Sequence, residues 1–118
     1  MKLNANNAGL DSEKIAATFL LQQGLKLLAT NYHCRYGEID LIMQDGKTLV
    51  FIEVRLRTNP NFADAANSIT AQKQQKLIST AEHFLQKNKI NMPCRFDAVL
   101  MSKADTANMQ WIRNAFGT

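Results

Sequence analysis

Residues 37–57 read GEIDLIMQDGKTLVFIEVRLR, and this stretch decides the fold. Side chains over residues 38–43 alternate between two faces, and within 48–57 every second residue from Val50 to Leu56 is apolar. Alternation with a period of two is typical of β-strands, and an Asp-Gly pair between two such runs favours a tight hairpin. We therefore predict two antiparallel strands joined at Asp45 and Gly46.

The hairpin gathers acidic side chains on one face. A turn at this position sets Met43 opposite Thr48, and the same count sets Glu38 opposite Glu53. Asp40 then shares that face, one diagonal step from Glu53, and diagonal neighbours lie within reach of one another. The sequence therefore predicts three carboxylates on one patch.

Neighbouring carboxylates repel one another, so their charge needs compensation. Mg²⁺ or Mn²⁺ would provide it, because both ions prefer hard oxygen ligands. The alternative is a solvated strand face on which Arg55 and Arg57 neutralise Glu38 and Glu53. Residue spacing alone leaves both interpretations open.

The segments around the hairpin indicate the fold class. Apolar residues at helical spacing predict a helix over residues 10–23, ended by Gly24, and a second over about 70–88, capped by Thr70 or Ser68. Shorter runs predict further strands over residues 25–29, 95–102 and 109–116. The order helix, three strands, helix and one or two strands favours an α/β domain, with a mixed central sheet flanked by helices.

Length and composition place the chain in a broad class. Its 118 residues, 46% hydrophobic and 20% charged, fit one domain over 1–118, with residues 1–8 frayed and 58–67 a mobile loop. No apolar run reaches the roughly 18 residues of a membrane span, and no secretory signal is visible. We expect a cytoplasmic protein without a membrane partner, whose Cys34 and Cys94 are free thiols.

Positive charge is concentrated in one segment. Residues 73–95 carry five basic side chains against one acidic, and the formal net charge is +4. Basic segments attract polyanions such as DNA. The candidate phosphate contacts are Lys73 and Lys76 at the start of the second helix, and Arg35 and Arg57 beside the carboxylates. A solvated, ion-paired surface remains the alternative for all of them.

Two motifs carry a family resemblance. Residues 37–42 (GEIDLI) and 50–55 (VFIEVR) at this separation resemble the YraN-like family of uncharacterised bacterial proteins. The similarity extends over Gly9, Glu13, Ala16 and Ala17, Asn31 and Tyr32, Thr70 and Lys73, and residues 95–97 (RFD). The resemblance implies the restriction-endonuclease-like fold of the PD-(D/E)xK nuclease superfamily.

The resemblance also implies roles for individual residues. Asp40 and Glu53 match the two acidic residues that ligate a catalytic metal ion, and Glu13 matches a helix glutamate that completes the site in some branches. With Glu38, these are the candidate metal ligands. Arg55 stands where a lysine is usual. Arginine stays protonated and cannot act as a general base, but it can hold a phosphate or stabilise developing charge.

Three functions remain in view. The first is a metal-dependent endonuclease that uses Asp40, Glu53 and Arg55 to direct a metal-activated water at a phosphodiester of DNA, such as a branched or repair intermediate. The second is a nucleic-acid-binding module of the same fold without cleavage. The third is a protein-interaction domain, of which a homodimer is one form.

Overall fold

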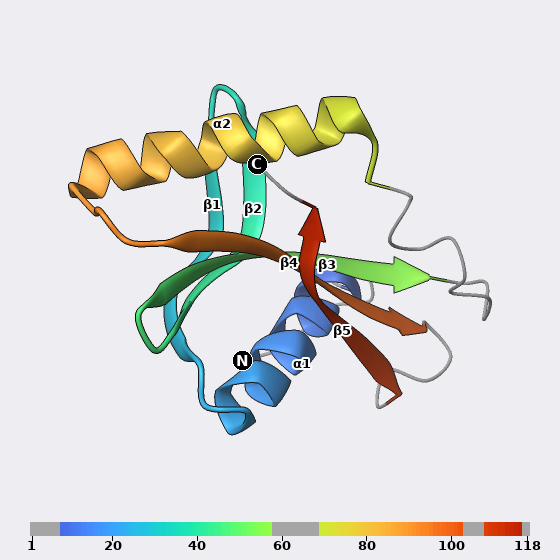
Figure 1. Cartoon of the computed structure of the whole chain (residues 1–118). Coiled ribbons are helices and arrows are strands. Elements are labelled where there is room, and N and C mark those ends of the chain that lie inside the picture. The colour runs from blue at the N-terminus through green and yellow to red at the C-terminus, as the bar shows by residue number, and fades with distance from the viewer. Residues whose placement is uncertain (1–7, 58–68, 103–107, 117–118) are drawn as a thin grey trace.

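The computed structural model describes residues 8–57, 69–102 and 108–116, with the side chains of 8–11 and 57 left aside. Figure 1 shows the elements, which are α1 (Ala8–Gln22), β1 (Lys26–Cys34), β2 (Gly37–Asp45), β3 (Thr48–Arg57), α2 (Ala71–Asn88), β4 (Cys94–Ser102) and β5 (Met109–Phe116). The expected frayed start and the loop over 58–67 lie outside the described residues, except that Ala8 already belongs to α1.

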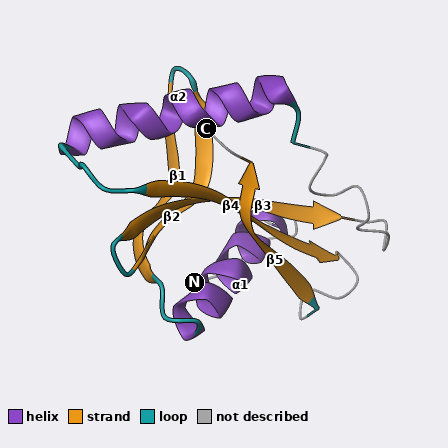
Figure 2. Ribbon diagram, viewed as in Figure 1, coloured by secondary structure: helices purple, strands orange, loops and turns teal. Residues whose placement is uncertain are grey.

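The strands form one mixed sheet in the order β1-β2-β3-β4-β5. β3 and β4 run parallel, and the other neighbours are antiparallel. Figure 2 shows α1 and α2 on opposite sides of this sheet. The prediction of a mixed α/β sheet with a helix on each side is confirmed. Within the described residues, no helix is long and apolar enough to cross a membrane.

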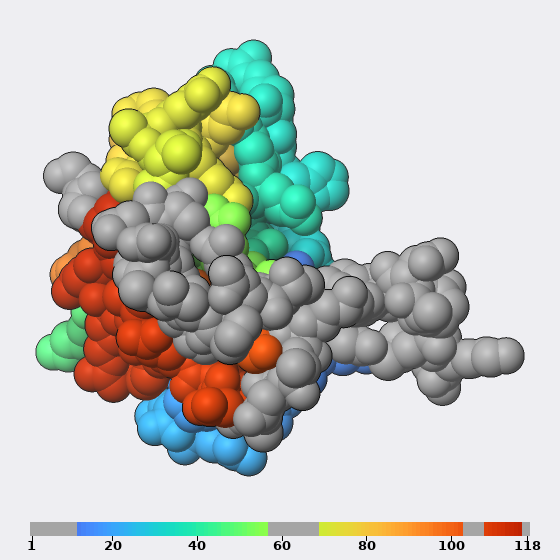
Figure 3. All heavy atoms as spheres, turned by 90° about the vertical axis from the view of Figure 1, so that its right-hand side faces the viewer, coloured from blue at the N-terminus to red at the C-terminus, as the bar shows by residue number. Residues whose placement is uncertain are grey.

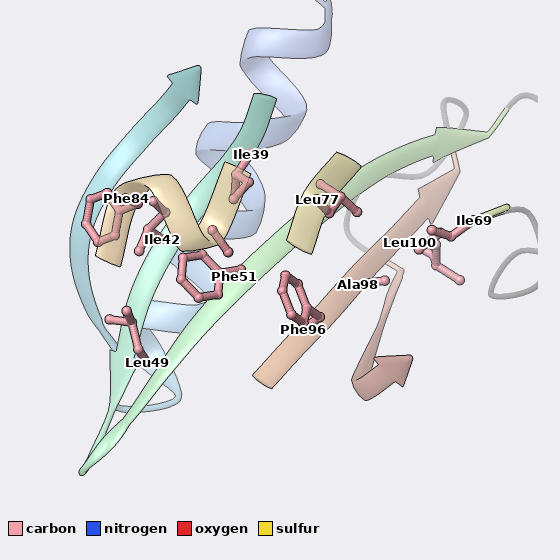
Figure 4. Close-up of a cluster of buried hydrophobic side chains, with 11 residues drawn as sticks. Ile39, Ile42, Leu49, Phe51, Ile69, Leu77, Phe84, Phe96, Ala98 and Leu100 are labelled. Carbon is pink, nitrogen blue, oxygen red and sulfur yellow. The ribbon is translucent and has the colours of Figure 1, made fainter. Parts of the chain in front are cut away.

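Two hydrophobic clusters hold the helices to the sheet. The strict alternation of β3 supplies both, because Leu49 and Phe51 pack under α2 while Val50 and Ile52 pack under α1. Figure 4 shows the first cluster, in which Leu77 and Phe84 of α2 meet side chains from β2, β3 and β4. Burying each large apolar side chain contributes about 1.5–3 kcal/mol.

Both helices are capped by residues that the sequence predicts, Gly24 at the end of α1 and Thr70 at the start of α2. Gly24, at φ 100°, follows α1, and the N–H groups of Gly24 and Leu25 return to carbonyls of the last helical turn. This is a Schellman motif, which needs a residue that accepts positive φ. Thr70 caps α2 by accepting a hydrogen bond from the Lys73 N–H. Of the two predicted caps, Thr70 is therefore the one used.

The predicted hairpin register is wrong by two residues. Asp45, rather than Met43, lies opposite Thr48, so Gly46 and Lys47 form the turn. Gly46 has φ 62°, a conformation that glycine adopts without strain. A shift of two keeps every side chain on its expected face. It does change the pairing, because the register ends with Leu41 opposite Ile52, and Asp40 rather than Glu38 is the acidic residue next to that end.

The strand predicted over residues 25–29 extends to Cys34. Its polar second half forms strand because β2 supplies partners, with Thr30 opposite Leu41 and Tyr32 opposite Ile39. β1 is an edge strand, so polar side chains there remain in contact with solvent. Pairing with a neighbour therefore outweighs local composition.

Candidate active site

A pocket of about 450 Å³ opens between the start of β2, the end of β3 and the first turns of α2. In Figure 3 the green end of β3 lies between the yellow start of α2 and the cyan β1–β2 hairpin. The lining comprises Gly37, Glu38, Asp40, Glu53, Val54, Arg55, Leu56, Lys73, Lys76 and Leu77. Most of the site residues predicted from the sequence thus share one pocket.

Gly37 allows β2 to begin directly against α2. It has φ 156°, and a Cβ at this position would lie 3.1 Å from the Thr80 hydroxyl oxygen and 3.6 Å from the Lys76 Cβ. Thr80 is fully buried, and its hydroxyl donates to the Lys76 carbonyl. A side chain at residue 37 would therefore push the hairpin away from α2 and change the width of the pocket.

Asp40 is a half-buried carboxyl at the junction of β2 and β3. Its Oδ2 accepts the Val54 N–H at 2.8 Å, so the side chain bridges to the neighbouring strand. Burial raises the pKa of Asp40 to about 7. The charges of Glu53 and Glu13 add to the rise, as does a hydrogen bond with Glu13, whereas the Val54 N–H opposes it. Asp40 therefore titrates near neutral pH.

Glu13 brings α1 into contact with this carboxyl. Burial raises the pKa of Glu13, the charges of Glu38 and Glu53 raise it further, and hydrogen bonds with Asp40 and Asn31 oppose the rise. Its Oε1 is buried and has no hydrogen-bond partner among the residues that the structure describes. The site thus holds a carboxylate oxygen with unused capacity to accept a proton or bind a cation.

Asn31 is the contributor that sequence reasoning missed as a site residue. It sits within β1 at φ 51°, a left-handed conformation that asparagine tolerates better than most residues. Its side chain interacts with Glu13. The signal available in the sequence was the family resemblance at Asn31 and Tyr32, which implied no role for either residue.

Glu53 is 9% exposed and is held by two cations. The Lys73 Nζ lies 2.6 Å from its Oε2, and the Arg55 Nε lies 3.3 Å from the same oxygen. The Arg55 Nε is buried and makes no hydrogen bond to a described residue. Lys73 is therefore the closer partner of Glu53.

The remaining candidates lie at or beyond the rim. Glu38 is exposed, although it lines the pocket and its charge acts on Glu13. Arg35 lies in the β1–β2 turn, where it donates to the Tyr36 hydroxyl at 2.8 Å and is not among the lining residues. Arg57 ends β3, but its side chain falls outside the described part of the chain.

The residues fit a divalent cation in part. Among the described residues, no three His, Cys, Asp or Glu side chains converge as a ready ligand set. Glu13 and Asp40 are neighbours, whereas the Glu53 carboxylate is engaged by Lys73. The unpartnered Glu13 Oε1 and the mutual repulsion of three carboxylates fit Mg²⁺ or Mn²⁺, which prefer oxygen ligands.

Comparison with known protein families shows to which proteins this chain is related. A family model described as "Uncharacterised protein family UPF0102" matches residues 12–101, which include every residue of the pocket. The chain belongs to this family. The family resemblance predicted from the sequence is thereby confirmed.

UPF0102 relatives are similar along nearly their whole length. A UPF0102 protein of Methylobacillus flagellatus is 55% identical, over 92% of this chain and 95% of the relative. One from Nitrosomonas europaea is 55% identical over 96% of each chain, and one from Psychromonas ingrahamii is 48% identical over 95% and 91%. Membership in UPF0102 names no reaction, so the chemistry has to come from the pocket.

Proposed function

We propose that this UPF0102 protein is a metal-dependent endonuclease that acts on DNA, with branched or repair intermediates as its substrate class. The observation that carries the proposal is that one pocket is lined by the carboxylates of Asp40 and Glu53 and by the cationic side chains of Arg55 and Lys73. Carboxylates for a cation and cations for a phosphate are the two requirements of metal-assisted phosphodiester hydrolysis.

The order of the elements supports the same proposal. An antiparallel β1-β2-β3 meander is followed by α2 and by β4, which is parallel to β3. This arrangement agrees with the restriction-endonuclease-like fold that the sequence resemblance implies. Fold alone does not define a reaction, so the pocket carries more weight.

The charged residues in and beside the pocket then have roles. Asp40, Glu53 and Glu13 would hold Mg²⁺ or Mn²⁺, with Glu38 at the rim. The ion would lower the pKa of a water and polarise a phosphoryl oxygen. Arg55 stays charged, so it holds the scissile phosphate and stabilises the charge that develops during attack. Asp40 has to lose its proton to act as a ligand, which favours activity above neutral pH.

Surface charge supplies the affinity for DNA in this proposal. Lys73 and Lys76 line the pocket, and Arg35 extends the positive surface along the β1–β2 turn. Each lysine or arginine that contacts a phosphate releases counterions, so binding should weaken steeply as salt rises. The side chain of Arg57 is a further candidate, on sequence grounds alone.

One observation favours the second function, a nucleic-acid-binding module without cleavage. Glu53 already has Lys73 and Arg55 beside it, and Arg55 replaces the usual lysine, so the pocket is electrostatically balanced at this position. Such a module would bind DNA equally well with and without Mg²⁺. Metal dependence of binding therefore separates the two functions.

Exposed leucines are the observation that favours the third function, a protein-interaction domain. Leu21, Leu27 and Leu28 are 40–47% exposed, and the last two belong to edge strand β1. A homodimer remains a prediction, as does the cytoplasmic location. Light scattering over a range of protein concentrations would test the dimer directly.

Cleavage of DNA by matched variants tests the leading proposal. Wild type, Glu53→Gln, Asp40→Asn and Glu82→Gln would be incubated with duplex, single-stranded, flap and four-way-junction DNA in Mg²⁺ or Mn²⁺. Glu82 is an exposed glutamate of α2 that does not line the pocket, so it controls for loss of a negative charge. We expect the first two variants to lose about a hundredfold or more of the activity. Undiminished cleavage by Glu53→Gln, or none by wild type on any substrate, would refute it.

A further inference from the structure

The strongest ion pair of the pocket is formed by a carboxylate that the proposed function assigns to a metal ion. The Lys73 ammonium lies 2.6 Å from Glu53 Oε2, and Glu53 is 9% exposed. A carboxylate this buried requires a cationic partner, because removing its partner leaves an uncompensated charge. In the metal-free protein Lys73 provides most of that compensation.

The Lys73 ammonium can move away from Glu53 more easily than the Arg55 guanidinium can. The Lys73 side chain is 41% exposed, whereas that of Arg55 is 22% exposed with a buried Nε. The Lys73 backbone is fixed, since its N–H is bonded to the Thr70 side chain at 3.1 Å. A flexible four-carbon stem on a fixed base lets the ammonium move while the helix stays in place.

We propose that Lys73 is a built-in competitor of the metal ion, its ammonium occupying the cation position on Glu53 until a divalent ion displaces it toward a DNA phosphate. This inference rests on the proposed function. It accounts for the lack of three converging His, Cys, Asp or Glu side chains among the described residues, since Glu53 is engaged by Lys73. The exchange keeps Glu53 neutralised in both states.

The displaced ammonium has a suitable destination. Lys73 lies in the first turn of α2, where free backbone N–H groups and the helix dipole favour an anion. Lys76, also in the pocket lining, adds a second positive charge one turn further on. A phosphate bound here would receive the ammonium that the metal ion releases.

The exchange couples the two ligands. Metal binding frees a cation for the phosphate, and a bound phosphate draws the competing cation away from Glu53. By thermodynamic linkage, each ligand then raises the affinity for the other by the same factor. Lys73 is thus a positioning residue. Its removal should raise the affinity for the metal ion and reduce the increase in DNA affinity that the metal ion causes.

Calorimetric titration of Mn²⁺ without DNA tests the competition. The proteins are wild type, Lys73→Gln, Lys73→Met and Lys76→Gln, with circular dichroism to verify folding. Lys76→Gln is the matched control, because it removes the same charge from the same pocket without a described ion pair to Glu53. We expect both Lys73 variants to bind Mn²⁺ about tenfold more tightly than wild type, and Lys76→Gln to change the affinity much less.

The outcomes separate the two proposals. If wild type binds Mn²⁺ and the Lys73 variants bind no more tightly than Lys76→Gln, the competitor role is overturned while the metal site stands. If neither wild type nor the Lys73 variants bind Mn²⁺, the metal site and the competitor role both fail. Weaker binding by the Lys73 variants would also overturn the competitor role.

A second experiment tests whether the Lys73 ammonium contacts a DNA phosphate when the metal ion is bound. Affinity for a phosphorothioate-linked duplex, which resists cleavage, is measured with and without Mn²⁺. We expect Mn²⁺ to raise the affinity of wild type several-fold more than that of Lys73→Gln, and the salt dependence of the variant to fall by about one charge in Mn²⁺. Equal enhancement in the two proteins would contradict the transfer of Lys73 to DNA.

Discussion

Asp40 on β2 and Asp97 on β4 are aspartates of the same sheet in opposite electrostatic situations. Asp97 is 1% exposed and fully partnered: Arg95 Nε lies 3.1 and 3.2 Å from its two oxygens, Trp111 Nε1 donates at 2.9 Å and the Asn114 N–H at 3.0 Å. Asp40 is half-buried and receives the Val54 N–H, but it faces Glu13 and Glu53. One aspartate is compensated and the other is crowded by like charges.

The two aspartates differ in what their contacts contribute to the stability of the fold. Arg95 also reaches Asp45 at 2.9 Å, so the group around Asp97 ties β4 to β5 and to the end of β2. Nothing comparable is gained at Asp40, where folding has to bring negative charges together. Groups held at a cost to stability are concentrated at functional sites. The comparison therefore supports a structural role for residues 95–97 (RFD) and leaves residues 37–42 and 50–55 as the motifs proposed for chemistry.

Removal of the compensated aspartate should have the largest effect. Asp97→Ala removes the acceptor of the Arg95 Nε and of the Trp111 N–H, and leaves the Arg95 guanidinium with Asp45 alone. Breaking a buried ion pair in this way costs about 3–5 kcal/mol. Urea denaturation monitored by tryptophan fluorescence would measure the loss. A loss below about 1 kcal/mol would contradict the structural role, with Glu82→Gln as the control for charge removal.

Neutralising the crowded aspartate should have the opposite sign. The pKa of Asp40 is about 7 in the folded protein, against its usual 3.8. The native state therefore holds a proton that the unfolded chain has released, and this contribution to stability is lost as pH rises from about 4 through 7. Asp40→Asn should thus stabilise the protein at pH 8 by about 2–4 kcal/mol.

Stability curves for wild type and Asp40→Asn at pH 4.5, 6, 7 and 8 test the sign. Both proteins share the other titrating groups, so the difference between the curves reports Asp40 together with its interaction with Glu13. The difference should grow with pH. A constant difference would mean that Asp40 does not titrate in this range, and destabilisation at pH 8 would show that its ionised form contributes favourably.

Much of the fold could be predicted from periodicity and caps. Residues 48–57 and 109–116 were predicted as strands with the bounds found for β3 and β5, and Thr70 and Gly24 mark helix ends through local backbone chemistry. The hairpin register could not be fixed, because two turn placements differing by two residues keep the same faces. The second half of β1 was missed because its partner, not its composition, makes it a strand.

The candidate site was predicted as a set of residues but not as an arrangement. Faces and motifs brought Asp40, Glu53 and Arg55 together, and the resemblance added Glu13. The ion pair between Lys73 and Glu53 joins a helix to a strand 20 residues earlier, so no local pattern contains it. The same holds for Asn31, whose contact with Glu13 depends on how α1 packs beside β1.

A milder substitution probes one contact of Asp97. Trp111→Phe keeps the ring that packs edge-on against Phe19 at 6.2 Å and removes only the N–H donated to Asp97. Loss of a hydrogen bond to a charged group costs about 1.5–3 kcal/mol, and the remaining partners of Asp97 place the expected loss at the lower end. Thermal unfolding followed by far-ultraviolet circular dichroism would measure it. A loss equal to that of Asp97→Ala would mean that the indole, rather than the aspartate, organises the group.

The smallest expected change in stability tests the crowding itself. Glu13→Gln removes one negative charge and the hydrogen-bonded carboxylate from beside Asp40, both of which raise the Asp40 pKa. The free energy of unfolding at pH 7 should rise by less than about 1 kcal/mol, because Glu13 is only partly buried. The midpoint of the pH-dependent loss of stability should move to lower pH, whereas Glu82→Gln should leave it in place. If the midpoint stays fixed in Glu13→Gln, Glu13 does not raise the Asp40 pKa and α1 does not contribute to the electrostatics of the pocket.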